Sequence, residues 1–324
     1  MQTVADQADL SFQAMGTKIR ILVGAPATSA ALAPKRAAQK AKESILLFEK
    51  TCSRFNAQSE LSQLNNDSRQ TVKVSPLLAQ AVQAAIWAAG ATEGLVDPTL
   101  LNDLIEAGYK DSWQPKRRIS LHQALKLMPE PEAAEANPSS LWQQISVDPV
   151  KGTVSRPAGT IIELGGTGKG LAADLASEYL TDYACWAVDC GGDIRVGGTA
   201  GISRLVQIMD SDGQQYGSFE ITKGAAATSG IGSRIWINAS GQPAHHLIDP
   251  STGQPAFTGL VAATAKAPTA LQAETLAKQA FLSGPQRAEI LLSKEGGLIR
   301  GTDLRAIDIP QRISKVKLRL KVGA

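Results

Sequence analysis

Long hydrophobic runs are missing from this 324-residue sequence. No stretch approaches the roughly 18 apolar residues that a membrane helix needs, so we expect no membrane span. The first residues, MQTVADQADLSFQA, also lack the charged start and the apolar stretch of a signal peptide. We therefore expect either a cytoplasmic protein or an extracytoplasmic one whose signal peptide has been removed.

Cysteine and aromatic residues are scarce, and neither charge sign dominates. The three cysteines are an odd number and form no Cys-x-x-Cys pair, so no metal or redox motif is indicated. Aromatic residues make up only 5% of the chain, which argues against an array of base-stacking side chains. A net charge of +3, from 33 basic and 30 acidic residues, gives no case for a nucleic-acid partner.

Apolar residues make up 43% of the chain, enough for a substantial core. In the first third, residues 18–23 alternate as a strand does, and residues 35–50 repeat apolar side chains at helical spacing. A second helix is predicted with Ser75 as its N-cap, Pro76 at its first position and Gly90 after its end.

The later chain predicts a sheet with attached helices. Residues 110–155 are polar and rich in proline, and we expect a short helix and loops there that join two halves. Helix 269–283 has Thr269 and Gln272 at capping-box spacing. Short apolar runs between glycine turns predict strands at 160–164, 186–188, 194–196, 205–209, 235–237 and 260–264. The tail 313–322 alternates apolar and basic residues, which predicts an edge strand protected by lysines, with a membrane-surface segment as the alternative.

A glycine-rich segment, Glu163-Leu-Gly-Gly-Thr-Gly-Lys-Gly170, follows one of these runs and precedes a helical stretch. Glycine lets a ligand approach the backbone closely, and a helix N-terminus presents free N–H groups to phosphate. The segment is not a P-loop, because the spacing before Lys169 is too short and Gly170 stands where Ser or Thr is required. An anion site and a tight structural turn both remain open.

Two further segments have small residues. Gly191-Gly-Asp193 is typical of a hairpin, whereas Thr228 and Ser229, in Ala227-Thr-Ser-Gly230, suit close contact with a nucleotide. The chain lacks the G-x-S-x-G elbow around these residues, which disfavours a serine hydrolase.

Adjacent histidines and a charged helix pair are further candidates. His245 and His246 should point to opposite faces of a strand, so only one of them can face a site. Glu274 and Lys278 are four residues apart on the late helix, where the ordinary interpretation is a surface ion pair.

Taken in order, these segments resemble the ApbE family of flavin transferases. The matching stretches are Met15–Thr17, Ser53–Asn56, Ser59–Leu61, Asn65, Gly94–Thr99, Glu163–Gly170, Gly191–Asp193, Ala227–Gly230, His246–Pro250, Thr252–Gly253 and the helix at 267–284. The resemblance implies one domain at 12–300 with a C-terminal extension at 301–324. It also implies an α+β fold, with a mixed sheet core and flanking helices in two tightly associated halves around one flavin site.

The resemblance also implies an activity. Such proteins transfer FMN from FAD to a Thr or Ser hydroxyl of a target protein and release AMP. The targets carry a Ser/Thr-Gly-Ala-Ser/Thr-like motif and include subunits of membrane redox complexes. Members of the family usually act outside the cytoplasmic membrane, which favours a periplasmic location.

The resemblance assigns residues to the flavin. Those at FAD-contacting positions of the family are Met15, Phe55, Leu95, Val96, Asp97, Glu163, Lys169 and Ile248. Phe55 would stack on a flavin or adenine ring, and Lys169 would pair with phosphate or order the glycine turn. His246, with Asp249 beside it, is the candidate for the proton of the target hydroxyl, since an unperturbed imidazole titrates near pH 6.5. A purely orienting role for His246 stays open.

The metal site departs from the family pattern. The family holds Mg²⁺ with a glycine-turn oxygen, here Gly166, and with an Asp and a Thr on the late helix, where this chain has Glu274 and Lys278. Glutamate can ligate magnesium with altered geometry, but a protonated lysine cannot. Its ammonium can instead occupy part of the metal's space. Three hypotheses follow: a transferase with a modified metal site, a non-catalytic FAD-binding protein, and an FAD pyrophosphatase that yields FMN and AMP.

Overall fold

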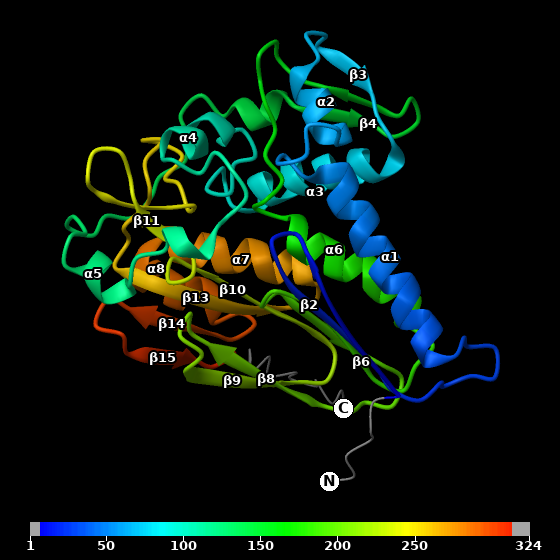
Figure 1. Ribbon diagram of the computed structural model, residues 1–324. Coiled ribbons are helices and arrows are strands. Elements are labelled where there is room, and N and C mark those ends of the chain that lie inside the picture. The colour runs from blue at the N-terminus through cyan, green and yellow to red at the C-terminus, as the bar shows by residue number, and fades with distance from the viewer. Residues whose placement is uncertain (1–6, 313–324) are drawn as a thin grey trace, which may run out of the picture.

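The fold is built on an eight-stranded sheet. A computed structural model describes residues 7–312 of the chain, and these residues form an α+β fold (Figure 1). In spatial order the strands are β1 (Ala8–Ala14), β2 (Thr17–Val23), β6 (Trp186–Cys190), β7 (Ile194–Gly197), β10 (Gly224–Gly230), β13 (Leu260–Ala267), β14 (Gly297–Gly301) and β15 (Ala306–Ile309). All neighbouring pairs are antiparallel, where a mixed sheet was expected. Tight hairpins such as β1–β2 and β6–β7 explain the antiparallel pairing, because a parallel pair would need a long crossover.

Helices cover one face of this sheet. They are α1 (Pro34–Cys52), α6 (Gly168–Ser177), α7 (Ala270–Leu282) and α8 (Gly284–Leu292). The opposite face is covered by the hairpin of β8 (Arg204–Met209) and β9 (Gln215–Ile221). Successive side chains of β6 point to opposite faces of the sheet: Val188 packs toward the helices, and Ala187 packs toward the hairpin.

A second half lies beyond α1, α6 and α7 (Figure 1). It contains α2 (Glu60–Asn66), α3 (Pro76–Ala91), α4 (Leu101–Glu106) and the small sheet β3 (Thr71–Lys73), β5 (Thr153–Ser155) and β4 (Ser146–Asp148). The remaining elements are the 3-10 turns Pro115–Arg117, Leu141–Gln144 and Glu178–Leu180, helix α5 (Leu121–Leu125), and the strand pair β11 (Ile235–Ile237) and β12 (Pro243–His245). No described helix is both long enough and apolar enough to cross a membrane.

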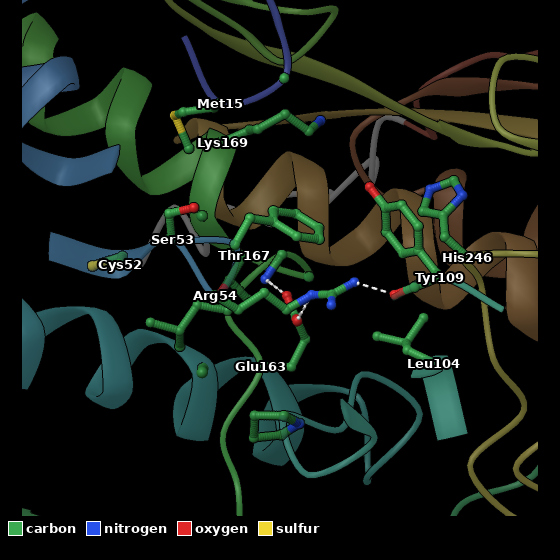
Figure 2. Close-up of a pocket in the computed structure, with 18 of the residues that line it drawn as sticks. Met15, Cys52, Ser53, Arg54, Leu104, Tyr109, Glu163, Thr167, Lys169 and His246 are labelled. Atoms are coloured by element: carbon green, nitrogen blue, oxygen red, sulfur yellow. Dashed lines mark hydrogen bonds and ion pairs between the residues drawn. The ribbon is translucent and has the colours of Figure 1, made fainter. Parts of the chain in front are cut away.

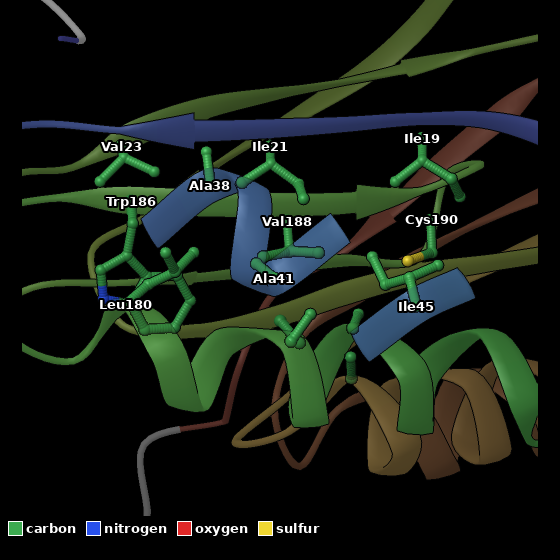
Figure 3. Packing of buried hydrophobic residues seen from close by; sticks show 14 of the residues in the cluster. Ile19, Ile21, Val23, Ala38, Ala41, Ile45, Leu180, Trp186, Val188 and Cys190 are labelled. Atoms are coloured by element: carbon green, nitrogen blue, oxygen red, sulfur yellow. The ribbon is translucent and has the colours of Figure 1, made fainter. Parts of the chain in front are cut away.

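The predicted strand 18–23 and helix 35–50 are confirmed, and together they build the main core. Ile19, Ile21 and Val23 point from β2 toward the inner face of α1, and Val188 joins them from the next strand (Figure 3). Ile45 on α1 is fully buried against them. Two segments with different periods therefore meet through their apolar faces, as binary patterning requires.

The predicted ends of helices α3 and α7 are only partly confirmed. Ser75 caps α3 by accepting the amide of Leu78, but Gly90 lies inside the helix, which continues to Ala91. Thr269 likewise caps α7 through the amide of Gln272. The side chain of Gln272 does not return a bond to the cap, because its buried Oε1 has no partner among the described atoms.

The strand predicted at 160–164 is wrong. This stretch has no regular secondary structure, because side-chain and loop groups take its backbone bonds. The amide of Asn65 bonds both the carbonyl and the N–H of Ile162, at 2.9 and 2.8 Å. The segment 110–155 also contains strands β4 and β5, which its proline content hid. The edge strand predicted at 313–322 lies outside the described residues.

Candidate functional site

A cavity of about 490 Å³ lies where the two halves meet. It is bordered by the α1–α2 loop, the glycine segment before α6, and the last turns of α7. The predicted residues that line it are Met15, Phe55, Leu95, Val96, Asp97, Glu163, Gly166, Lys169, His246, Ile248 and Lys278. Positions far apart in the sequence therefore converge on one space.

The glycine segment is a tight turn braced by a buried carboxylate. Oε1 of Glu163 accepts the amide of Gly165, and a Cβ on Gly165 would lie only 2.5 Å from that oxygen. Oε2 of Glu163 pairs with Nε of Arg54 at 2.6 Å, and Arg54 also donates to the carbonyl of Tyr109 at 2.8 Å (Figure 2). Burial raises the pKa of Glu163, and the Arg54 charge opposes that shift. Glu163 thus shapes the cavity wall.

Aromatic and acceptor groups line the same cavity. The ring of Phe55 is 42% exposed, with the guanidinium of Arg54 4.1 Å from its centroid and Tyr109 edge-on at 5.7 Å. Oδ1 of Asp97 accepts both the amide and the hydroxyl of Thr99, whereas its buried Oδ2 has no partner among the described atoms. Asp97 thus brings an acceptor without a hydrogen bond to the border of the cavity.

Lys169 projects from the first turn of α6 into the cavity (Figure 2). Its ammonium forms an ion pair with buried Asp193 and lies 3.8 Å from Glu274. Burial alone would lower the pKa of Lys169, but these two carboxylates hold it above its usual value. Lys169 therefore stays cationic at neutral pH.

Glu274 is buried and pairs with the partly buried Lys278, so the ordinary interpretation of a surface ion pair is wrong. Glu274 is only 1% exposed, and its Oε1 accepts from Nζ of Lys278 at 2.9 Å. Its Oε2 accepts the amide of Gly170 at 2.8 Å. A Cβ on Gly170 would lie 2.5 Å from the carbonyl oxygen of Ala270, so only glycine allows α6 to approach α7 this closely.

These residues do not fit a magnesium ion. Both oxygens of Glu274 are engaged by groups of the chain itself, and a lysine stands at the expected second side-chain ligand. Gly166 lines the cavity, but in residues 7–312 no group of three or more His, Cys, Asp or Glu side chains could hold a metal. Gly166 and Lys278 thus line the cavity, and buried Glu274 fixes the ammonium of Lys278.

The two histidines face opposite ways, as predicted. His245 is fully buried, with its ring centroid 4.8 Å from that of Phe257, and burial lowers its pKa to about 3. His246 borders the cavity, and its Nδ1 has no partner in the described part of the chain (Figure 2). Burial and then the charge of Arg234 lower the pKa of His246 well below 6.5, so the expectation of an unperturbed imidazole is wrong.

Asp249 does not join His246. It lines neither cavity described here, and its Oδ1 accepts from the amides of Ser251 and Glu135, at 2.9 and 3.1 Å. This side chain shapes the turn after β12.

A second cavity, of about 520 Å³, adjoins the first and shares part of its lining. Thr228 and Ser229 border it, and the Thr228 hydroxyl bonds that of Thr264 at 2.9 Å. These two predicted residues therefore lie apart from the first cavity. The residues shared by both cavities are Gly16, Trp113, Gly165, Lys169, Arg234, His246 and Lys278. The border shared by the two cavities, called the junction below, therefore has three cationic side chains and the imidazole of His246.

Some of these site residues were missed in the sequence. Arg54, Asp193 and Arg234 lie within or close to the segments that match the family, so their charges could have marked them as candidate site residues. Tyr109 and Trp113 had no such signal in the sequence, because they lie at the start of a polar stretch. Only the fold brings them to the cavities.

The fold defines an α+β protein with two adjoining cavities that share a cationic border. The chain belongs to the ApbE family, whose model matches residues 15–299.

Curated relatives share sequence with this chain, and solved structures share its fold. FAD:protein FMN transferase of Escherichia coli K12 is 29% identical over 142 residues, which span 42% of this chain and 40% of that protein. The Vibrio cholerae protein of the same name is 27% identical over 245 residues, spanning 72% and 70%. The ApbE protein of Thermotoga maritima superposes with a TM-score of 0.74 at 24% identity, covering 93% and 96% of the two chains. Flavin transferase ApbE of V. cholerae gives 0.70 at 21% identity, covering 95% and 97%.

Proposed function

We propose that this chain is an FAD:protein FMN transferase, which moves FMN from FAD to a Thr or Ser hydroxyl of a target protein and releases AMP. The observation that carries this proposal is the meeting of two cavities at Lys169, Lys278, Arg234 and His246. Two separate spaces at one charged junction suit a reaction between two large substrates.

The first cavity has the groups that FAD needs. The exposed ring of Phe55, flanked by Tyr109, offers a stacking surface for an aromatic ring. The free Oδ2 of Asp97 offers an acceptor for a ring N–H. Cations at the junction offer charge-assisted hydrogen bonds to the pyrophosphate.

The second cavity gives the acceptor a route to the same phosphates. In the proposed step the target hydroxyl attacks the phosphorus of the FMN moiety, and a P–O–P bond breaks so that AMP leaves with its phosphate. The hydroxyl proton passes to His246 and then to water. Fixed cations stabilise charge that develops on the phosphoryl oxygens.

His246 suits a proton acceptor in the loaded site. Burial, and then the neighbouring cations, hold its pKa low, so the imidazole is neutral in the free protein. A bound pyrophosphate brings negative charge beside it, which favours the protonated form and raises the pKa during the reaction. His246 is therefore the proposed proton acceptor, and Asp249 is a turn residue.

The acceptor and the compartment are proposed from the family resemblance. We propose a membrane redox subunit with a Ser/Thr-Gly-Ala-Ser/Thr-like segment, modified outside the cytoplasmic membrane. The second cavity favours this transferase over a pyrophosphatase, because hydrolysis by water needs no such space.

The test uses FAD and a carrier protein with an exposed Thr-Gly-Ala-Thr segment. We expect flavin fluorescence that stays on the carrier after denaturing electrophoresis. A matched carrier with Val in place of both threonines should stay dark, and His246→Ala should slow labelling by about 100-fold or more. Flavin that binds the enzyme but never labels the carrier would indicate the non-catalytic alternative.

A further inference from the structure

Three cationic side chains gather at the junction of the two cavities. Lys169, Lys278 and Arg234 border it, whereas the carboxylates paired there are Asp193 and Glu274. Arg234 has no ion-pair partner within residues 7–312. Of these three cations, Arg234 is therefore the one that no described carboxylate holds in an ion pair.

The position of Lys278 conflicts with a divalent cation. Its Nζ lies 2.9 Å from Oε1 of Glu274, the carboxylate that would have to ligate the metal. Magnesium bonds oxygen at about 2.0–2.1 Å, so an ion on Oε1 would lie against a second cation. The other oxygen is held by the amide of Gly170, at 2.8 Å. Metal binding would require this buried pair to break.

We propose that Lys278, together with Lys169 and Arg234, neutralises the pyrophosphate of FAD in place of a metal, so that this chain binds FAD without a divalent cation. The inference rests on the proposed function and specifies its phosphate site. Lys278 is well placed for this role, because its ammonium is fixed by Glu274 and borders both cavities. A fixed ammonium needs little reorganisation when the ligand arrives.

Isothermal titration of FAD into the wild-type protein, in EDTA and then in MgCl₂, tests the proposal. We expect dissociation constants that agree within about twofold in the two buffers, a difference well under 1 kcal/mol. An affinity that is tenfold or more higher with magnesium would overturn the proposal and leave the transferase function in place. Absence of FAD binding in both buffers would instead overturn the proposed function.

Variants at position 278 separate charge from packing. Lys278→Met keeps the length of the side chain and removes the charge, so we expect affinity for FAD in EDTA to fall by about tenfold or more. Lys278→Arg should retain most of the binding. Lys126→Met, at the exposed lysine that caps the C-terminus of α5 and lines neither cavity, is the matched control and should bind as the wild type does.

Lys278→Thr frees Oε1 of Glu274 and should create a response to magnesium that the wild type lacks. If Lys278→Met loses its fold because Glu274 is left unpaired, the double variant Glu274→Gln/Lys278→Met removes the orphan charge. The proposal requires weak FAD binding in that double variant also. Wild-type affinity in a folded Lys278→Met or double variant would contradict it.

Discussion

Neighbouring residues in this chain differ sharply in environment, as the two adjacent histidines show. His245 is packed in the core, and its Nδ1 accepts the amide of Leu247 at 3.3 Å. His246 instead borders both cavities beside Arg234 and Lys278. Strand alternation predicted the two directions, but not the low pKa of His246, because its burial and the cations around it depend on segments distant in sequence.

The buried state of His245 makes the stability of the fold depend on pH. Its folded pKa of about 3 lies below the unfolded value of 6.5, so the unfolded chain takes up a proton first as the pH falls. Stability should therefore fall by roughly 1.4 kcal/mol per pH unit from this group below pH 6.5. Urea unfolding at pH 8 and at pH 5.5 should show a smaller loss in His245→Leu than in the wild type. Equal losses would show that His245 does not titrate this way.

Met15 has an unfavourable backbone conformation at the cavity wall. It has a φ of 55° in the β1–β2 turn, where Asn is the usual residue before Gly16. Its amide bonds Oε1 of Glu49 at 2.6 Å, and its side chain packs partly into the core. Met15→Asn should relieve about 1 kcal/mol of strain and lose a similar packing energy, so Tm changes little while FAD affinity falls. A large loss of Tm would contradict this balance.

At the scale of elements, contact between α6 and α7 positions the charged junction. Asp174 on α6 accepts the amides of Ala270 and Leu271, both at 2.9 Å, and so holds the N-terminus of α7. Gly170 allows the two helices to touch. Lys169 and Glu274 are brought together by this packing, which no local pattern in the sequence describes.

Gly170→Ala should push these helices apart. The added Cβ would meet backbone atoms of Ala270 at 2.5 and 2.7 Å, so we expect a loss of about 2 kcal/mol or more in the free energy of unfolding. The matched control is Gly166→Ala, whose Cβ would meet only Val96 at 3.6 Å. Thermal unfolding should therefore separate the two variants, and equal Tm values would contradict the proposed helix contact.

Elements with a clear period were predicted well, and those held by side chains were not. Helices α1 and α7 and strand β2 follow their apolar spacing. The strand predicted at 160–164 does not form, because Asn65 supplies the hydrogen bonds that a neighbouring strand would have supplied. Likewise, most residues assigned to the flavin line the first cavity, but the charge spacing of Glu274 and Lys278 alone did not reveal that Glu274 is buried, because burial of α7 depends on β10 and β13.

At the scale of the whole molecule, the fold places one cavity on each side of a charged junction. The first lies between the two halves, and the second lies between the sheet and loops that include part of the β8–β9 hairpin. In the proposed function, this arrangement would let a nucleotide and a polypeptide reach the same phosphate from the two cavities. It also explains why the junction residues come from several separate segments of the chain.

The release of AMP from FAD, measured with and without the carrier protein in EDTA, tests this account most directly. We predict AMP in amounts equal to the covalently labelled carrier, and almost none when the carrier is absent or has valines in place of both threonines. Equal AMP release without the carrier would contradict the account and identify the protein as an FAD pyrophosphatase.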